Sequence, residues 1–258
     1  VGFGAMLAAG GPLLLAIVVT VAGAIGASFL LDRLFGLPTR MALLVACGNA
    51  ICGNSAIAAI APVIDADGDD VATSIAFTAV LGIVVVVAMP LVAVYLGLSA
   101  AGSGILAGLT VYAVPQVLAA AGPMGTAAVQ LGTLVKLVRV LALGPVVAVL
   151  SLLMARRAIA GGDSAAGQGR MFLLVPPFIL AFLGLAALHS LGLLPEAWVA
   201  PAHRASGLLT VLAMAGLGLC VDVRSVFAAG LRMVCVVTLS LLLLGGLAFG
   251  MMRLTGLA

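Results

Sequence analysis

Two groups of residues in this chain have types and spacings that could bind a ligand inside an apolar protein. One is the stretch CGNAICGNSAIAAIAP, residues 47–62, in which Gly, Asn, Cys and Ser interrupt a hydrophobic run. The other is the pair Lys136 and Arg139, which share one helix face because they are three residues apart. Amides and hydroxyls make directional hydrogen bonds, and the cations supply charge. Together these groups predict a binding site for a small anion.

The two cations need a partner, because each charge near the middle of a membrane costs about 3 kcal/mol. Every Asp and Glu lies in a predicted loop or at the end of an apolar segment, so we expect no intramembrane carboxylate beside Lys136 or Arg139. Uncompensated cations that face a cavity attract an anion. The alternatives are that they snorkel to the membrane interface, or pair with Asp222 or with a carboxylate outside this chain.

The polar stretch sits at the centre of a segment, Arg40 to Ile64, that is long enough to cross a bilayer, for which about 20 residues suffice. Its composition predicts a transmembrane helix that stops and restarts, which membranes tolerate only inside protein or beside water. A restart at Gly53 would point N–H groups at an anion. Alternatively, the small residues only allow close helix packing. The predicted binding residues are Asn49, Cys52, Gly53, Asn54, Ser55, Gln116, Lys136, Arg139, Gly216 and Gly218.

Composition assigns the chain to the multi-pass membrane proteins. Of its 258 residues 65% are hydrophobic and 7% are charged, against about 25% charged in soluble domains. The net charge of +3 is small and its basic residues are scattered, so we expect no nucleic-acid partner. The four cysteines lack CxxC spacing, which argues against a disulfide framework or a zinc site. We expect neither an enzyme nor a cofactor, because no predicted membrane segment carries His, Asp or Glu at catalytic spacing.

The predicted fold is all-α, with about eight membrane segments. They are residues 3–31, 40–64, 71–96, 102–121, 126–154, 171–194, 206–221 and 230–254. Pro115 and Gln116 make the fourth a candidate for a short or re-entrant helix. If every segment crosses, seven arginines (33, 40, 156, 157, 170, 224 and 232) lie on one side, and Arg204 and Arg253 lie on the other with the acidic connection 65–70. The positive-inside rule then makes the side with seven arginines cytoplasmic.

A weak internal symmetry predicts an inverted repeat. A long, a broken and a long segment begin at residues 3, 41 and 71, and a similar triplet begins at residues 171, 206 and 230. Residues 1–154 would hold the first repeat, incomplete at its N-terminus, and the start of the second. Residues 155–170, rich in Gly, Ser and Ala, would form a cytoplasmic linker, and residues 171–258 would complete the second repeat within one membrane domain.

Three motifs resemble a family of bacterial membrane proteins named as sulfate exporters. ICGNSAIAAIAPVIDAD, residues 51–67, resembles its ICGxSAIAAxAPVI motif. GLTVYAVPQVLAAAG with VKLVRVLALGPVV resembles its paired motif, and AMAGLGLCVDVRSV resembles its last broken helix. The family's His-Glu pair is replaced here near Val111, Tyr112 and Ala113, while Gln116 is kept. The resemblance implies about two further N-terminal helices, so we expect the chain to be truncated.

The resemblance also implies an inverted-repeat fold like that of the bile acid:sodium symporters and sodium/proton antiporters. Its crossing broken helices would be centred on Cys52 and Gly216. We therefore predict a transporter in the bacterial inner membrane that exports or exchanges a small anion, sulfate-like or an organosulfonate or carboxylate, by alternating access. The alternatives are a sodium- or proton-coupled symporter of an organic solute and an intramembrane sensor or enzyme. The expected partners are the anion, the lipid bilayer and a second copy of the chain.

Overall fold

The computed structural model describes residues 11–160 and 231–257, together with scattered positions between 184 and 216. Every regular element in these ranges is a helix, which confirms the all-α class. Four long apolar helical stretches could each cross a membrane: residues 13–34, 68–95, 126–154 and 233–254. The count of eight segments and the inverted repeat stay predictions, because much of the predicted sixth and seventh segments lies outside the described residues.

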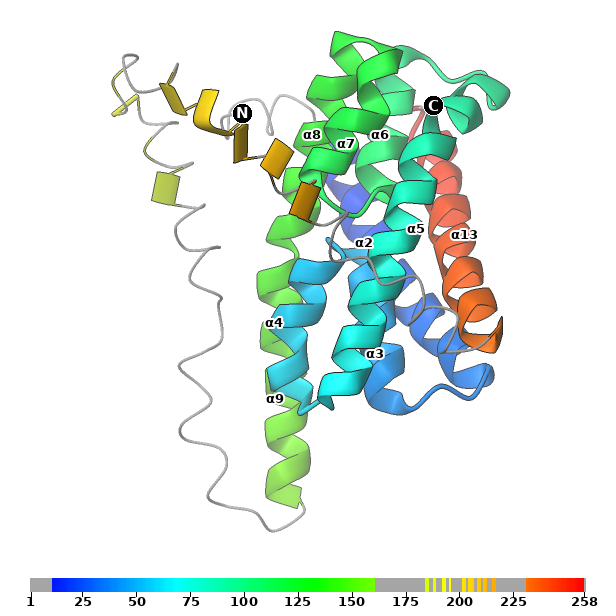
Figure 1. The fold of residues 1–258 in the computed structure, drawn as a ribbon, viewed down its shortest axis with the longest axis vertical. Coiled ribbons are helices and arrows are strands. Elements are labelled where there is room, and N and C mark those ends of the chain that lie inside the picture. Colours follow the sequence, from blue (N-terminus) through cyan, green and yellow to red (C-terminus); the bar gives the residue numbers. More distant parts are fainter. Residues whose placement is uncertain are drawn as a thin grey trace.

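The long stretches form a bundle (Figure 1). Their helices are α2 (Gly11–Leu34), α5 (Gly68–Tyr95), α8 (Thr126–Leu141) continued by α9 (Leu143–Ala160), and α13 (Leu231–Leu254). The interruption between α8 and α9 at Ala142 follows from Pro145, whose ring clashes with the carbonyl four residues earlier and which has no N–H to donate. Residues 155–160, predicted as the start of a linker, continue α9, and 161–170 lie outside the described residues.

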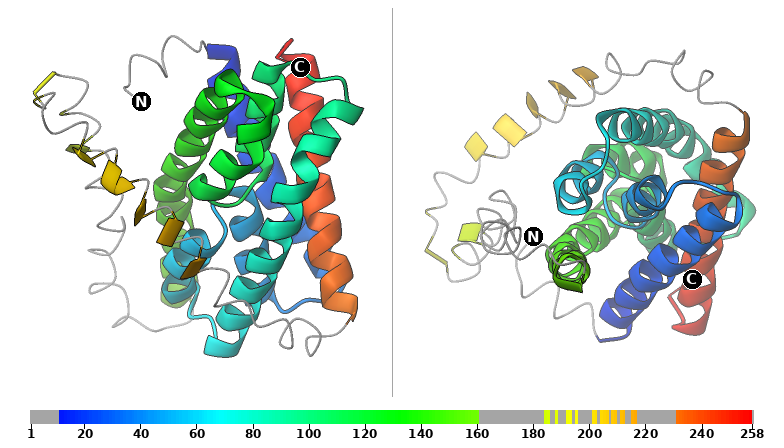
Figure 2. Two further views of the ribbon diagram at one scale, coloured as in Figure 1. Left: turned by 45° about the horizontal axis from the view of Figure 1, so that its top comes forward. Right: turned by 90° about the horizontal axis from the view of Figure 1, so that it is seen from below.

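Two pairs of short helices fold back on themselves inside this bundle. The lower hairpin is α3 (Thr39–Ala50) followed by α4 (Asn54–Ile64), and the upper hairpin is α6 (Ala100–Thr110) followed by α7 (Val114–Ala121). A 3-10 turn, η1 (Gly122–Met124), then leads into α8. In Figures 1 and 2 the lower hairpin enters from the lower end of the molecule and the upper hairpin from the opposite end.

An ion pair shows that the lower hairpin does not cross the bundle. Arg40 Nη2, in the first turn of α3, lies 3.5 Å from Asp65 Oδ2, directly after α4. A straight helix would place these residues about 37 Å apart at 1.5 Å per residue. The prediction that residues 40–64 form one transmembrane helix is therefore wrong, although its break at Cys52 and Gly53 is confirmed.

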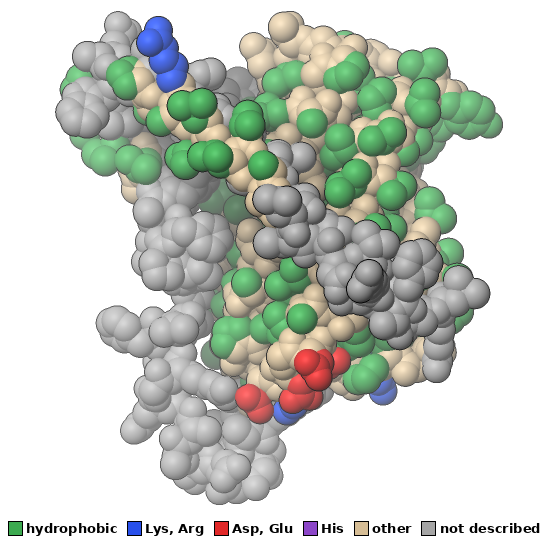
Figure 3. Space-filling view, in the orientation of Figure 1, with side chains coloured by type: hydrophobic (Ala, Val, Ile, Leu, Met, Phe, Trp, Pro, Cys, Tyr) green, Lys and Arg blue, Asp and Glu red, His purple; other side chains and the backbone are tan. Residues whose placement is uncertain are grey.

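The side predicted for the acidic connection is wrong as well. The acidic residues gather at the lower end, beside a blue arginine patch (Figure 3). Because α3 enters and α4 leaves at this end, Arg40 and the connection at residues 65–70 lie on the same side of the bundle. The sequence pattern could not reveal this, because a re-entrant pair of about 25 residues has the same length and hydropathy as one span.

The predicted fourth segment is confirmed as a short helix that breaks. It ends at Thr110, and the chain restarts at Val114 with Pro115 in the first turn of α7, where a missing N–H costs nothing. Glycines allow α6 to lie against α8: a methyl group at Gly108 would approach the carbonyl oxygen of Gly132 to 2.5 Å, and one at Gly104 would collide with Ala128. Small residues spaced by four thus hold the upper hairpin close to α8.

We expect cysteine labelling to separate the two ends of the molecule. In a background with the native cysteines replaced, Leu34→Cys and Asp67→Cys should react with a membrane-impermeant maleimide from the same side, and Ser99→Cys from the opposite side. If residues 40–64 crossed the membrane instead, Leu34→Cys and Asp67→Cys would label from opposite sides. Intact cells and inverted vesicles provide the two orientations.

Candidate functional site

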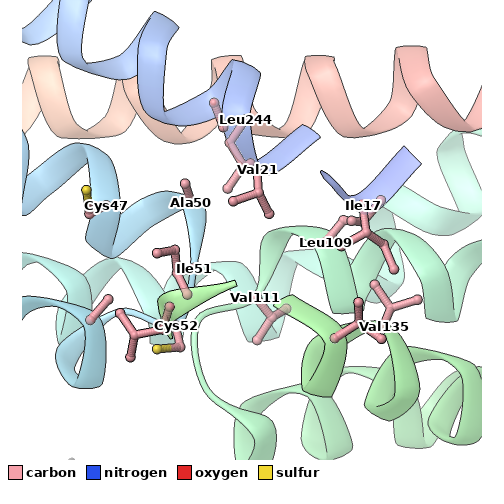
Figure 4. Packing of buried hydrophobic residues seen from close by; sticks show 14 of the residues in the cluster. Ile17, Val21, Cys47, Ala50, Ile51, Cys52, Leu109, Val111, Val135 and Leu244 are labelled. Atoms are coloured by element: carbon pink, nitrogen blue, oxygen red, sulfur yellow. The ribbon is translucent and has the colours of Figure 1, made fainter. Parts of the chain in front are cut away.

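The tips of the two hairpins meet in the interior of the bundle. The lower tip is residues 51–53 and the upper tip is residues 111–113, which link the helices of each pair. Figure 4 shows Ile51 and Cys52 of the lower tip facing Val111 of the upper tip, with Val135 of α8 nearby. Ile51, Val111 and Tyr112 are fully or almost fully buried. The tips therefore bring together backbone from two segments that are 60 residues apart in the sequence.

Gly53 makes this close approach possible. Its backbone has φ 67° and ψ −123°, a conformation that side chains with a Cβ rarely adopt. A methyl group there would also lie 3.1 Å from Cβ of Tyr112. The conformation and the contact together require glycine, and they explain why the sequence places one directly before the restart of the helix at Asn54.

The cation pair of α8 joins the two hairpins through their backbone carbonyls. Lys136 Nζ donates to the carbonyl oxygens of Ile51, at 2.7 Å, and Val111, at 2.8 Å, one in each tip. Arg139 donates from Nε to Ala50 O at 3.0 Å, from Nη2 to Asn49 O at 2.9 Å and from Nη1 to Gly108 O at 3.0 Å. Both side chains are completely buried.

These five hydrogen bonds give the cations partners that sequence reasoning did not anticipate. The acceptors lie at the carboxyl ends of α3 and α6 and in the tips, where the last carbonyls of a helix have no partner within the helix. Such ends carry a partial negative charge, so a cation there is favourable. No described carboxylate pairs with either residue. The sequence shows Lys136 and Arg139 together with two breaks, one rich in Gly and one containing Pro. It does not show which atoms the two cations contact.

Polar side chains surround the meeting point. Tyr112 Oη donates to Asn49 Oδ1 at 2.9 Å, whereas Asn49 Nδ2 is buried and has no hydrogen-bond partner among the described residues. Thr78 of α5 donates its hydroxyl to Asn54 Oδ1. Gln116 Oε1 accepts from the N–H of Ala113 at 3.2 Å, which closes the start of α7. Asn49 thus keeps an unused donor between the two hairpins.

Most of the predicted binding residues gather here. Asn49, Cys52, Gly53, Gln116, Lys136 and Arg139 are buried at or beside the tips, Asn54 is half-buried and Ser55 is exposed in the first turn of α4. Gly216 holds an isolated helical position, and Gly218 lies outside the described residues. In the described part of the chain, the break that meets the one at Cys52 is that of α6 and α7. Tyr112 and Thr78 were not predicted, and only their polarity within apolar runs marks them.

The long apolar helices are those of a multi-pass membrane protein. The comparisons with known proteins agree, and the relatives are bacterial. The family model described as conserved hypothetical protein 698 matches residues 1–237, and the chain belongs to this family. It is 54% identical to a UPF0324 membrane protein of Brucella suis over 98% of this chain and 74% of that protein. It is 51% identical to one of Agrobacterium fabrum over 96% and 69%, respectively.

A more distant relative, a UPF0324 membrane protein of Bacillus cereus, is 36% identical over 85% of this chain and 66% of its own length. No solved structure matches the chain. The relatives are named as membrane proteins, so the predicted family is confirmed, whereas the sulfate exporter name stays a prediction.

Replacing Lys136 with methionine should weaken the fold, because it leaves the carbonyls of Ile51 and Val111 without a donor in a buried setting. Each unsatisfied group costs about 1–3 kcal/mol. We expect Lys136→Met to lower the thermal unfolding temperature and the folded yield in detergent. Thr133→Ala is the matched control on the same helix, because the Thr133 hydroxyl contacts only the carbonyl of Val129 within its own helix. Equal stability of the two variants would contradict the bridging role.

Proposed function

We propose that the protein is a secondary transporter, and not an enzyme, that moves a small anion across the membrane by alternating access. The single observation that carries the proposal is the meeting of two hairpin tips from opposite ends of the bundle with two buried cations and no described carboxylate. Helices that break at mid-membrane and point their amino ends at one place are typical of transporter substrate sites. Sulfate-like anions, organosulfonates and carboxylates are the proposed substrates.

Charge at the tips supports an anion. The carboxyl ends of α3 and α6 each contribute about half a negative charge, and the amino ends of α4 and α7 each contribute about half a positive charge. These partial charges cancel, so the two charges of Lys136 and Arg139 remain. The five described carboxylates lie toward the lower end instead; they are Asp32, Asp65, Asp67, Asp69 and Asp70. A small anion at the tips would balance the excess.

The donors at the tips support the same ligand. Asn54 and Ser55 are the first two residues of α4, and their backbone N–H groups make no hydrogen bond to the described residues. The unused amide of Asn49 adds a side-chain donor. In this proposal Lys136 and Arg139 act through long-range charge and by holding the tips, while backbone and amide N–H groups contact the anion. Ser55, in the first turn of α4, is exposed on the described part of the bundle.

Opposed hairpins also support alternating access. The lower hairpin enters from one end and the upper hairpin from the other, as an inverted repeat requires. In this proposal the two hairpins, α3 with α4 and α6 with α7, occupy corresponding positions in two repeats of opposite orientation. Arg33, Arg40, Arg156 and Arg157 lie toward the lower end and Arg253 toward the upper end, so the positive-inside rule favours a cytoplasmic lower end.

Thermal stabilisation of the purified protein by a panel of anions tests the proposal. The panel is sulfate, sulfite, thiosulfate, bicarbonate, phosphate, small sulfonates and carboxylates. Binding to the native state alone adds about 2.7 kcal/mol at a hundredfold excess over Kd. We expect Asn54→Asp to abolish the response, because its carboxylate repels an anion at the start of α4. The same carboxylate keeps an acceptor for Thr78 and favours the helix amino end, so stability without ligand should be unchanged or higher.

Ser99→Asp is the matched control. Ser99 caps the amino end of α6, where its Oγ accepts from the N–H of Gly102, and this end is remote from the tips. This variant should respond to anions as the wild type does. An anion that stabilises Asn54→Asp as strongly as the wild type would rule out the site. A response to sodium alone, with none to any anion, would favour a cation-coupled symporter of an organic solute.

A further inference from the structure

One carboxylate lies inside the bundle without a cation. Asp32, in the last turns of α2, is completely buried, and the hydroxyl of Ser240 in α13 donates to its Oδ1 at 2.7 Å. Its Oδ2 has no hydrogen-bond partner among the described residues. Ser28, one helical turn earlier on the same face, is also completely buried and its hydroxyl has no partner either. The sequence placed Asp32 at the end of an apolar segment, and the structure shows that this end is covered by α13.

The surroundings of Asp32 are apolar. A cluster of buried hydrophobic residues lies at this end between α2, α3, α5 and α13: Leu37, Met41, Ala42, Val45, Phe77, Met233, Val236 and Val237. A carboxylate left ionised and unpaired in such a place costs several kcal/mol. The group therefore needs a positive partner or has to be neutral.

None of the described cations supplies that partner. Arg33, next in α2, donates to the carbonyl of Leu37. From the helices packed against α2, Arg40 pairs with Asp65, Lys136 and Arg139 hold the tips, and Arg253 stacks on Phe249. The other titratable groups on the neighbouring helices α3, α5 and α13 do not neutralise a carboxylate; they are Cys47, Asp69, Asp70, Tyr95 and Cys235. The side chain of Arg232 is outside the description.

The ligands available favour a proton over a metal ion. Hard metal cations take about six or more oxygen ligands. Asp32, Ser28 and Ser240 offer four side-chain oxygens, and the described residues contain no group of three or more His, Cys, Asp or Glu that could hold a metal ion. The carbonyls of α2 and α13 are used within the helices. Binding a proton needs only one oxygen, and it converts the carboxylate to a neutral acid that the apolar cluster can accommodate.

We propose that Asp32 is a proton-binding site of this protein, with Ser240 and Ser28 as its polar neighbours, and that it holds its proton in the conformation seen here. The carboxylate gains one proton at Oδ2 and no other bond changes. Separation of α2 from α13 would expose the acid to water and release the proton. Proton binding at Asp32 does not depend on the anion site.

A line of buried residues, three of them polar, runs along one face of α2 from Asp32 toward its amino end. Thr20, Ala24, Ser28 and Asp32 follow one another at intervals of four along α2, and all are buried. The hydroxyl of Thr20, like that of Ser28, has no partner among the described residues. Val21, beside Thr20, lies near Ala50 at the carboxyl end of α3 in Figure 4.

Infrared difference spectroscopy of the purified protein tests the site directly. We expect the wild type to show the carbonyl stretch of a protonated carboxylic acid at neutral pH, and the band to disappear on raising the pH. Asp32→Asn should lack the band, and Asp65→Asn, which removes an exposed acid, should keep it. Persistence of the band in Asp32→Asn would overturn the proposal. So would its loss in the wild type when sodium replaces choline at constant pH, because a metal ion would then occupy the site.

Ser240→Ala and the pH dependence of stability give independent readouts. The Ser240 hydroxyl stabilises the ionised form, so its removal should make the infrared band persist to higher pH. A proton held only in the folded state stabilises that state at low pH, and the contribution is lost as the pH rises. The unfolding temperature of the wild type should therefore fall toward alkaline pH more steeply than that of Asp32→Asn. Identical slopes, or an unmoved band in Ser240→Ala, would contradict the assignment. These readouts involve no anion, so they are separable from the test of transport.

Discussion

The architecture depends on how two helices that end inside a membrane protein satisfy their last carbonyls. Neither α3 nor α6 reaches the opposite end of the bundle. Water is not available at that depth to donate hydrogen bonds to their last carbonyls. Lys136 and Arg139 supply the donors from a third element, α8, and each contacts both hairpins. Hydrogen bonds to charged groups contribute about 1.5–3 kcal/mol each. Five of them offset the cost of two buried cations, about 3 kcal/mol apiece.

The two hairpins have different packing partners, and glycines determine both. The upper hairpin is held against α8 by the glycine contacts at Gly104, Gly108 and Gly132, so it and the cations form one unit. At the lower hairpin, a methyl group at Gly48 would lie 3.1 Å from the side chain of Ile57, which shows how closely α3 and α4 approach. Small residues therefore serve two purposes. They bring the arms of the hairpins together, and at Gly53 they permit the turn at the tip.

Much of the fold follows from the sequence, and the exceptions have a common cause. Hydropathy sufficed for the four long helical stretches of the described residues, the Gly, Asn and Ser residues around Cys52 for the lower break, and Pro115 for the upper one. The residues of the tips were found because Asn49, Gly53 and Asn54 are costly in a lipid-facing helix. The path of residues 40–64 was missed, because hydropathy gives the length of an apolar stretch but not whether it returns. The contact between Arg40 and Asp65, 25 positions apart, and the close approach of Gly48 to Ile57 distinguish a hairpin from a span.

The same limit applies to charge. Sequence placed Lys136 and Arg139 in the membrane and implied an anionic partner, but helix ends are themselves partners, and their positions depend on the fold. Asp32 is the converse case. It lies two residues from the end of α2, where a carboxylate is usually solvated. Here α13, more than 200 residues away in the sequence, covers it, and Ser240 donates a hydrogen bond to it. Which charged side chains are buried in this protein therefore depends on which helices pack against one another. Ser240 of α13 holds Asp32, whereas Lys136 and Arg139 of α8 hold the tips, so the two buried charged sites depend on different helix contacts.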